Sequence, residues 1–438
     1  MNMKKQFSNT FLALPLAMFL FLFFLLALPH EASAADVTID GTVSAFANTY
    51  TQSANAVFTD SQTGYVFFVD SDDRLVYYKT TNGGQSWGSA VPISAVESDV
   101  VGFAVWYDGW TPADTGTKIH LLYLEATFVD DVLYRSLDTS GDSLGTERIV
   151  FNAASIEPGG HVAIAKSRGG NLYAVGFDDN TSSERFAVKS GNEFASVSTI
   201  AAVGFTGSEP VLMFPGNEAD PNDMWLIFLD SAADIVYLKT YDDSLDSWGT
   251  TEIAANTNPD FFDGDPWMSG AVRHSDGHLI FAILNDFDIS TGDIRVWDIN
   301  GASSITPKTD VVTNSDDIFF SPVFIDQNTD DIYVGYAGKS NGSETIGTSV
   351  GVYYKKSTDG GTSWGSEQTY AESLGNVRML SGSFGGSNTR FMLNWYYPGP
   401  ADLMTNFINS IEIIAPETPA RIIRLRGTVQ FLGTVRLR

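Results

Sequence analysis

The residues of this chain best suited to chemistry gather in one loop, residues 258–267. Its carboxylates and aromatic rings alternate: Asp260, Phe262, Asp263, Asp265 and Trp267. Neutral sugars stack on aromatic faces, and glycoside hydrolysis needs two carboxylates roughly 5–10 Å apart. The same oxygens suit Ca²⁺, which takes about six to eight oxygen ligands. The loop is a candidate glycan site and, through Asp260, Asp263 and Asp265, a candidate calcium site; a solvated loop held by an aromatic contact is the competing interpretation.

A repeated turn indicates which elements position that loop. Residues 357–364 read Ser-Thr-Asp-Gly-Gly-Thr-Ser-Trp after an alternating strand, and residues 80–87 repeat them with Asn for Asp. Glycine permits the positive φ of a tight reversal, an Asp or Asn side chain bonds turn N–H groups, and the tryptophan covers the hairpin. These structural positions are Asn82, Gly84 and Trp87 in the first copy and Asp359, Gly361 and Trp364 in the second.

Two looser copies follow similar strands, one with Asp138 and the other with Asp242 and Trp248. The motif resembles the Asp-box, or BNR repeat, S/T-x-D-x-G-x-S/T-W, of sialidase-like β-propellers. Residues 357–364 match it in full, and residues 80–87 match it with one change. In that family the box is a structural turn, so the resemblance implies a fold and says little about chemistry.

Spacing supports a propeller. The gaps from Leu144 to Trp248 and from Trp248 to Trp364 are each about twice the gap from Trp87 to Leu144, so each should hold one further blade that lacks the box. These two blades are read at residues 161–203 and 266–313, each with several short strands.

The last segment, residues 376–413, supplies only three strands, and residues 37–43 can add the fourth and close the ring. We therefore expect an all-β propeller of four-stranded antiparallel blades over residues 35–415. Seven blades are favoured, and six, the usual number in sialidases, are the alternative.

The sialidase chemistry itself is missing. That family binds a sugar carboxylate with three arginines, because a guanidinium pairs a carboxylate bidentately. It also carries an Arg-Ile-Pro motif, which this chain lacks. Only Arg273 and Arg378, on the expected innermost strands, are candidates to face the central funnel and bind a ligand. The pair Trp106 and Trp110 is expected to pack in the core, with a sugar platform as the alternative.

The chain is strongly acidic, with 53 Asp and Glu against 25 Lys and Arg and a net charge of −28. This balance argues against nucleic acid, whose phosphates attract the opposite charge. In a propeller, the loops between second and third strands and between blades share the upper face, and here they contain many of the carboxylates. Calcium binding is one interpretation of this acidity, and solubility is the other. No cofactor is expected to be required, and the absence of cysteine excludes thiolate chemistry.

The two ends differ from the middle. Residues 1–34 have Lys4 and Lys5, an apolar run and Ala-Ser-Ala, which is typical of a secretory signal peptide. A retained membrane anchor is the alternative. Residues 416–438 form a proline linker and a basic, β-prone repeat tail, interpreted as a frayed or incomplete repeat or as a segment that docks to a partner or the cell surface.

These observations favour an exported, secreted or cell-surface propeller that binds glycan or an extracellular protein without catalysis. It is not expected to be an integral membrane protein once the signal is removed. The alternative is a glycoside hydrolase that uses carboxylates of the upper face.

Overall fold

The computed structural model describes residues 37–43, 54–94, 99–125, 131–151, 161–178, 184–204, 211–230, 233, 235–255, 268–284, 292–313, 322–338, 351–371, 377–387, 389–397 and 402–408. Within these ranges the chain consists of strands, turns and one short 3₁₀ helix, η2 (Asp108–Trp110). No helix in these described ranges is long and apolar enough to cross a membrane.

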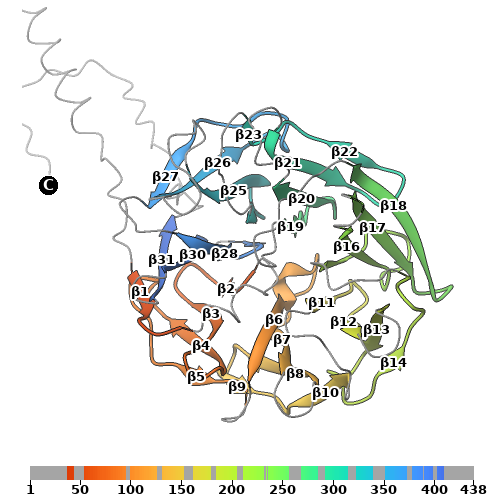
Figure 1. Ribbon diagram of the computed structural model, residues 1–438, viewed down its shortest axis with the longest axis horizontal. Coiled ribbons are helices and arrows are strands. Elements are labelled where there is room, and N and C mark those ends of the chain that lie inside the picture. The colour runs from red at the N-terminus through yellow and green to blue at the C-terminus, as the bar shows by residue number, and fades with distance from the viewer. Residues whose placement is uncertain are drawn as a thin grey trace, which may run out of the picture.

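The described strands form seven sheets, four with four strands and three with five, set around a common centre (Figure 1). This confirms the predicted all-β propeller of four-stranded antiparallel blades. Each blade runs outward from an innermost strand, so the first strands line the axis and the fourth strands form the rim. The second strands are near-continuous apolar runs because neighbouring blades cover both of their faces.

The blades follow the chain in order. Blade one contains β2 (Ala56–Phe58), β3 (Gly64–Val69), β4 (Leu75–Thr80) and β5 (Val91–Pro92). Blade two contains β6 (Val100–Tyr107), β7 (Lys118–Glu125), β8 (Val132–Asp138), β9 (Ser143–Leu144) and β10 (Arg148–Phe151). Blade three contains β11 (Ala163–Lys166), β12 (Leu172–Asp178), β13 (Glu184–Ser190) and β14 (Ser198–Thr199). Blades four and five contain β15 (Val211–Pro215), β16 (Met224–Asp230), β17 (Ile235–Asp242), β18 (Ser247–Ala255); and β19 (Met268–Val272), β20 (Leu279–Leu284), β21 (Gly292–Ile299), β22 (Ile305–Pro307), β23 (Val312–Thr313). Blade six contains β24 (Val323–Asp326), β25 (Asp331–Ala337), β26 (Val352–Ser357), β27 (Gln368–Ala371) and, in parallel with β24, β29 (Gly385–Gly386).

The last blade joins the two ends of the propeller. It contains β28 (Arg378–Gly382), β30 (Phe391–Tyr397) and β31 (Asp402–Ile408) from the end of the chain and β1 (Val37–Asp40) from its start. Strand β1 pairs antiparallel with β31, with Val37 opposite Thr405. The closing strand predicted from residues 37–43 is therefore confirmed.

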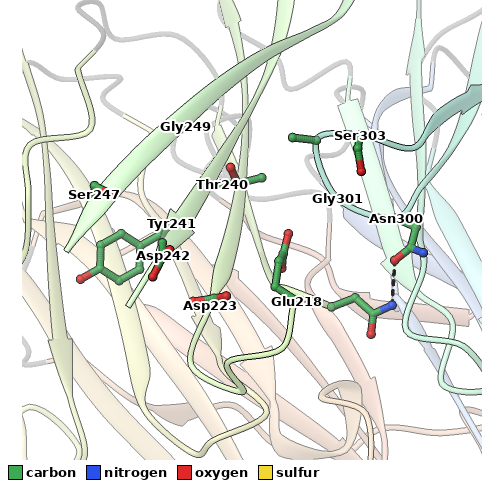
Figure 2. Close-up of a pocket in the computed structure, with 12 residues that line it drawn as sticks. Glu218, Asp223, Thr240, Tyr241, Asp242, Ser247, Gly249, Asn300, Gly301 and Ser303 are labelled. Carbon is green, nitrogen blue, oxygen red and sulfur yellow. Dashed lines mark hydrogen bonds between the residues drawn. The ribbon is translucent and has the colours of Figure 1, made fainter. Parts of the chain in front are cut away.

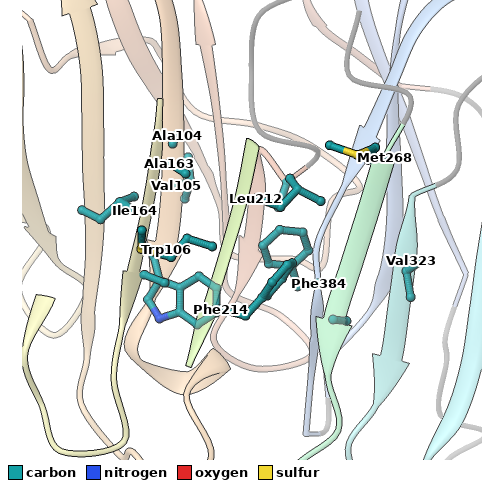
Figure 3. Packing of buried hydrophobic residues seen from close by; sticks show 14 of the residues in the cluster. Ala104, Val105, Trp106, Ala163, Ile164, Leu212, Phe214, Met268, Val323 and Phe384 are labelled. Carbon is teal, nitrogen blue, oxygen red and sulfur yellow. The ribbon is translucent and has the colours of Figure 1, made fainter. Parts of the chain in front are cut away.

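An aromatic cluster packs the axis of the ring. Trp106 lies 5.8 Å from Trp110 and 6.3 Å from Phe214 between ring centroids, and Trp110 lies 4.9 Å from Phe384. These four rings come from blades two, four and seven, and all are buried. Figure 3 shows three of them, Trp106, Phe214 and Phe384, side by side. The Trp110 Nε1 also donates a hydrogen bond of 3.1 Å to the carbonyl of Gly385. Trp106 and Trp110 are thus core residues, as expected, and not a surface platform.

The predicted structural turns of blades one and six are confirmed in their hydrogen bonds. In blade six Asp359 accepts from the Ser363 N–H at 2.9 Å and from its hydroxyl at 2.6 Å, while the Ser357 hydroxyl accepts from the Gly361 N–H. In blade one Asn82 accepts from the Ser86 N–H at 3.0 Å. Gly83 and Gly84 of blade one and Gly360 and Gly361 of blade six have positive φ, between 68° and 88°.

A third turn of this kind, residues 190–197 of blade three, was missed by the sequence reasoning. Asn192 accepts from the Ser196 N–H and the Ser190 hydroxyl accepts from the Phe194 N–H, as in the other two turns. The expectation that residues 161–203 lack the box was therefore wrong. Glu193 and Phe194 replace the two glycines, yet both keep positive φ, 57° and 56°. We refer to residues 80–87, 190–197 and 357–364 as the box turns.

The side chains of blade two hold these two strained residues in place. Glu193 forms an ion pair with Lys118 and accepts from the Ser136 hydroxyl, and the Phe194 ring lies 4.9 Å from that of Tyr134. Left-handed backbone at a side-chain-bearing residue costs roughly 1–2 kcal/mol. Contacts with the neighbouring blade offset this cost, which is why the motif survives without its glycines.

The looser copies are hairpins of a different type. Asp138 pairs with Ser143 across a four-residue loop, and Asp242 pairs with Ser247 in the same way. Both carboxylates accept turn N–H groups, so their structural role is confirmed, but the turn is not a box. Trp248 stacks on Tyr241 of its own hairpin at 4.9 Å.

Removing a ring from the axial cluster should destabilise the whole propeller. For Trp106→Ala we expect a loss of about 3–5 kcal/mol in the free energy of unfolding, because a fully buried aromatic leaves a cavity. Leu245→Ala is the control, since Leu245 is 72% exposed and its loss should change stability by under about 0.5 kcal/mol. Urea unfolding measures both, and equal losses would contradict the assignment.

The box of blade six should respond to acid. Hydrogen bonds from the Ser363 side chain and backbone lower the pKa of Asp359 to about 2. Its stabilising effect is therefore complete above the unfolded pKa of about 4 and is lost as the pH falls through 2. Asp359→Asn should keep the turn, as Asn82 does, whereas Asp359→Ala should lower the melting temperature at pH 7. Melting curves between neutral and acidic pH test this; an Asn variant as unstable as the Ala variant would refute it.

Candidate functional site

The predicted ligand loop lies outside the described residues. This applies to Asp260, Phe262, Asp263, Asp265 and Trp267 alike. The glycan and calcium roles of that loop stay predictions, as does the docking role of residues 416–438. In the described part of the chain, no three His, Asp or Glu side chains are grouped as a metal site.

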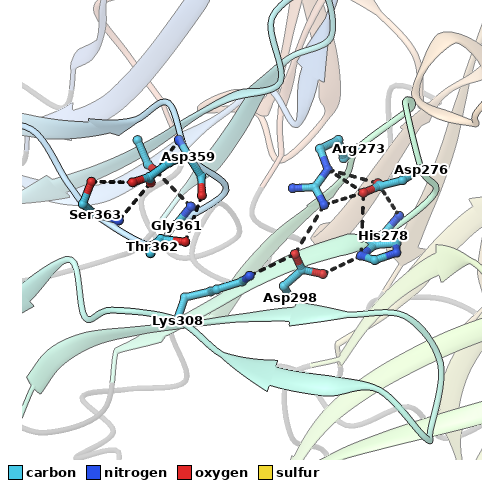
Figure 4. A network of polar contacts seen from close by, with 10 residues as sticks. Arg273, Asp276, His278, Asp298, Lys308, Asp359, Gly361, Thr362 and Ser363 are labelled. Atoms are coloured by element: carbon cyan, nitrogen blue, oxygen red, sulfur yellow. Dashed lines mark hydrogen bonds and ion pairs between the residues drawn. The ribbon is translucent and has the colours of Figure 1, made fainter.

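Arg273 is engaged in structural ion pairs. Its guanidinium contacts Asp276 at 2.5 Å and Asp298 at 3.3 Å, and the residue is only 8% exposed. Asp298 also binds His278 at 2.7 Å and Lys308 at 3.3 Å, so the cluster ties blade five together beside the blade-six box (Figure 4). Arg273 thus has a structural role in blade five, and its ligand-binding role stays a prediction.

Arg378 keeps its predicted place on an innermost strand. It begins β28, where its backbone pairs with that of Tyr396. Its side chain lies outside the described part of the structure, so its ligand-binding role stays a prediction.

Charged contacts join the first four blades on the lower face, which carries the turns between first and second and between third and fourth strands. At each of three junctions, a carboxylate on the outer hairpin turn of one blade meets a lysine of the blade before it. We call these pairs junction clasps: Lys79 with Asp142, Lys118 with Glu193 and Lys189 with Asp243.

Two of the clasps contain the same third member. Tyr65 donates its hydroxyl to Asp142 at 2.6 Å, and Tyr173 donates to Asp243 at 2.9 Å. Each tyrosine lies directly across the sheet from the clasp lysine, Lys79 or Lys189. The carboxylate is thus neutralised and bonded on both sides, which fills the space between the two blades.

The junction between blades four and five has no such clasp within the described residues. Trp225 and Thr240 form the cross-strand pair at this position. The outer turn of blade five carries Gly301, Ala302 and Ser303, which have no carboxylate and little bulk. The short side chains leave a groove of about 540 Å³, which we call the junction groove (Figure 2).

The lining of the junction groove is polar and acidic. Its members with charged or amide side chains are Asn217, Glu218, Asp223, Asp242 and Asn300, without a lysine or arginine. The Asn217 amide donates to the Asn300 side-chain oxygen at 2.8 Å and thereby joins the two blades. The groove consequently offers many hydrogen-bond acceptors and no cation of its own.

The electrostatics of the junction groove follow from this lining. Burial, with the negative charges of Asp220, Glu218 and Asp242, raises the pKa of Asp223 to about 6. Hydrogen bonds from Ser244 and the following turn N–H lower the pKa of Asp242. One carboxyl is thus partly protonated near neutral pH beside a carboxylate that stays ionised.

Glu218 is bonded through only one of its oxygens. Its Oε1 accepts from Trp225 Nε1 at 2.6 Å, whereas Oε2 is enclosed and has no hydrogen-bond partner. An enclosed acceptor without a donor is unfavourable, so this carboxylate adds negative charge beside the groove that no donor offsets.

A second groove of about 490 Å³ lies on blade six. Its lining includes Tyr354, Trp364 and Gln368. Trp364 is half-buried, and its Nε1 donates to the Thr309 carbonyl at 2.8 Å, which fixes the ring against blade five. This groove offers an aromatic surface but no cluster of acidic groups.

The sequence reasoning missed the junction groove because its residues come from three separate turns, those between β15 and β16, β17 and β18, and β21 and β22. A signal did exist, because Lys79, Lys189 and Lys356 each directly precede the first residue of a box turn. Blade four has a lysine at a similar place in the sequence, Lys239, shortly before its four-residue hairpin loop. Only the register shows that Lys239 faces away, towards the Gly204 carbonyl at 3.3 Å.

Comparisons with known proteins support the fold. No family model and no curated protein matches the chain. An ulvan lyase of polysaccharide lyase family PL25, solved bound to -[GlcA(1-4)Rha3S]-, is similar over 86% of this chain and 95% of its own, with a TM-score of 0.53 and 10% identity. AofleA from Arthrobotrys oligospora covers 76% of this chain and 89% of its own at 12% identity and a TM-score of 0.47, too low to support an argument. The lyase shows a shared propeller fold, and the sialidase-like resemblance stays a prediction.

The occupied guanidinium of Arg273 yields one prediction. The protein should not hydrolyse sialosides, because the Arg273 side chain is committed to Asp276 and Asp298 and cannot clamp a sugar carboxylate. A fluorogenic sialoside assay measures this. Turnover that disappears in Arg378→Ala would contradict the prediction and assign a catalytic clamp to the remaining arginine.

Proposed function

We propose that the protein is an exported β-propeller that binds glycan at the junction groove without cleaving it. The observation that carries the proposal is the convergence of two amides and three carboxylates in one groove of about 540 Å³. Small-ligand sites commonly have volumes of about 300–1,000 Å³. Carboxylates and amides are well suited to sugar hydroxyls, which donate and accept hydrogen bonds in pairs.

The rigidity of the groove favours binding. Its walls are the ends of β16 and β17 and the turn after β21, and the Asn217–Asn300 bond fixes their separation. A preformed site loses little conformational entropy when a ligand binds. The ulvan lyase, which shares this fold, is bound to a saccharide, and this precedent supports a glycan as the ligand class.

Most of the acidic side chains already serve the fold, which supports the non-catalytic interpretation. Asp242 accepts the Ser244 N–H and hydroxyl of its own turn, and Asp223 accepts the Asp243 N–H at 2.9 Å. A nucleophile or base needs a carboxylate free to approach the substrate, and these two are held to their backbones.

The alternative is a glycoside hydrolase, and one observation favours it. The pKa of Asp223, raised to about 6, suits a proton donor at neutral pH, and Glu218 would be the second carboxylate. The signal peptide predicted for residues 1–34 supports an extracellular role under either alternative, and the acidic balance disfavours nucleic acid as a ligand.

Calorimetric titration with a panel of neutral, amino and acidic oligosaccharides tests the proposal. We expect binding that Asn300→Ala weakens about tenfold, the effect of losing roughly 1.4 kcal/mol. Glu252→Gln, an exposed change on β18 outside the groove, should leave affinity unchanged. Release of reducing ends that Asp223→Asn abolishes would favour the hydrolase, and a panel without any binding would refute both.

A further inference from the structure

The junction clasps show what a carboxylate on this face requires. Lys79 Nζ lies 2.6 Å from Asp142, and Lys118 and Lys189 contact Glu193 and Asp243 in the same manner. In each case the neighbouring blade supplies an ammonium to a carboxylate that lies between the two blades. At these three junctions a lysine therefore neutralises the carboxylate that lies between two blades.

The junction groove departs from this pattern. Glu218, Asp223 and Asp242 line it, and the lysine that blade four could supply, Lys239, points to the opposite side. Its ammonium lies 6.0 Å from the centroid of the Phe228 ring, and burial lowers its pKa. Thr240 stands at the strand position that the clasp lysine has in blades one and three, and its side chain is too short to reach across the groove.

Two further observations show that the negative charge in the groove is not compensated. Asp223 is 6% exposed and lies near other carboxylates, and the one hydrogen bond to its carboxylate among the described residues comes from the Asp243 N–H. The enclosed Glu218 Oε2 has no donor at all. The groove thus has space, negative charge and a buried acceptor without a partner.

A bare metal ion does not fit these features. Ca²⁺ needs about six to eight oxygens within 2.3–2.6 Å. No group of three acidic or histidine side chains is close enough for this in the described residues, and the groove is much larger than an ion. An organic cation fits better, because an ammonium can pair with the carboxylates that line the groove while the rest of the ligand fills it.

We propose that the junction groove selects glycans with a free amine, that is, amino sugars whose ammonium takes the place of the missing clasp lysine between Glu218 and Asp223. This rests on the proposed function, since it names the class of glycan bound at the same site. The ring hydroxyls then meet Asn217 and Asn300, whose amides lie across the groove. Charge-assisted bonds are about twice as strong as neutral ones, so the amine sets the specificity.

The experiment compares two ligands of equal length, a β-1,4-linked glucosamine oligosaccharide and its N-acetylated counterpart, by calorimetry with the full chain. We expect the free amine to bind at least about tenfold more tightly. Glu218→Gln should remove most of this preference. Glu252→Gln removes the same charge from the outer strand of the blade and should keep the preference, which separates the site from general attraction to an acidic protein.

A second variant tests the idea by supplying a lysine to the groove. Thr240→Lys places an ammonium at the strand position that Lys79 and Lys189 have in their own blades, where it can pair with the groove carboxylates, so it should raise the melting temperature and abolish binding of the glucosamine oligomer. This variant keeps the proposal testable if Glu218→Gln fails to fold.

The outcomes separate the two claims. Equal binding of both oligomers would overturn the amine selectivity and leave the proposed glycan binding intact. An equal loss in Glu218→Gln and Glu252→Gln, or full binding by Thr240→Lys, would also overturn it. No binding of either oligomer, or of any glycan in the panel, would refute the proposed function itself.

Discussion

The fold depends on the pairing of β1 with β31. A propeller is stable only as a closed ring, because each blade covers its flat faces with its neighbours. Residues from the two ends of the propeller share one sheet, so opening the ring would expose the faces of blades one and seven together. The axial cluster of Trp106, Trp110 and Phe384 depends on this closure, since its rings come from blades that meet only in the closed ring.

Closure in turn requires each junction to be filled on the lower face. The first three junctions use lysine–carboxylate clasps. At the junction of blades five and six, the Thr309 N–H and hydroxyl donate hydrogen bonds to the Gly361 and Thr362 carbonyls of the box turn. Between blades four and five the filling is incomplete, and acidic side chains remain without cations. Natural proteins tend to depart from a consistent structural rule at functional positions, and this is one reason why we propose the junction groove as the binding site.

Much of the fold was predictable because local patterns carried it. The box residues Asp359 and Asn82 form their hydrogen bonds within their own turns, so the local motif was enough to predict each hairpin and its blade. The box turn of blade three was not predicted, because Glu193 and Phe194 stand where the motif has glycine. Contacts with blade two stabilise their left-handed backbone, and local turn propensity does not reveal such contacts. The ion pairs of Arg273 were not predicted for a related reason: its partners Asp276 and Asp298 lie on the following turn and on the third strand, and the sequence pattern did not connect them.

The sequence by itself determined the blade repeat, the closing strand, the acidic balance and the turn chemistry, because each follows from residues close together or from composition. Tertiary structure decided which carboxylates are neutralised and which are left open. Lys79 and Lys239 occupy the same place before a turn, yet one faces the next blade and the other faces away. Side chains alternate along a strand, so a change of turn type reverses the face on which a lysine lies, and only the paired register shows that reversal.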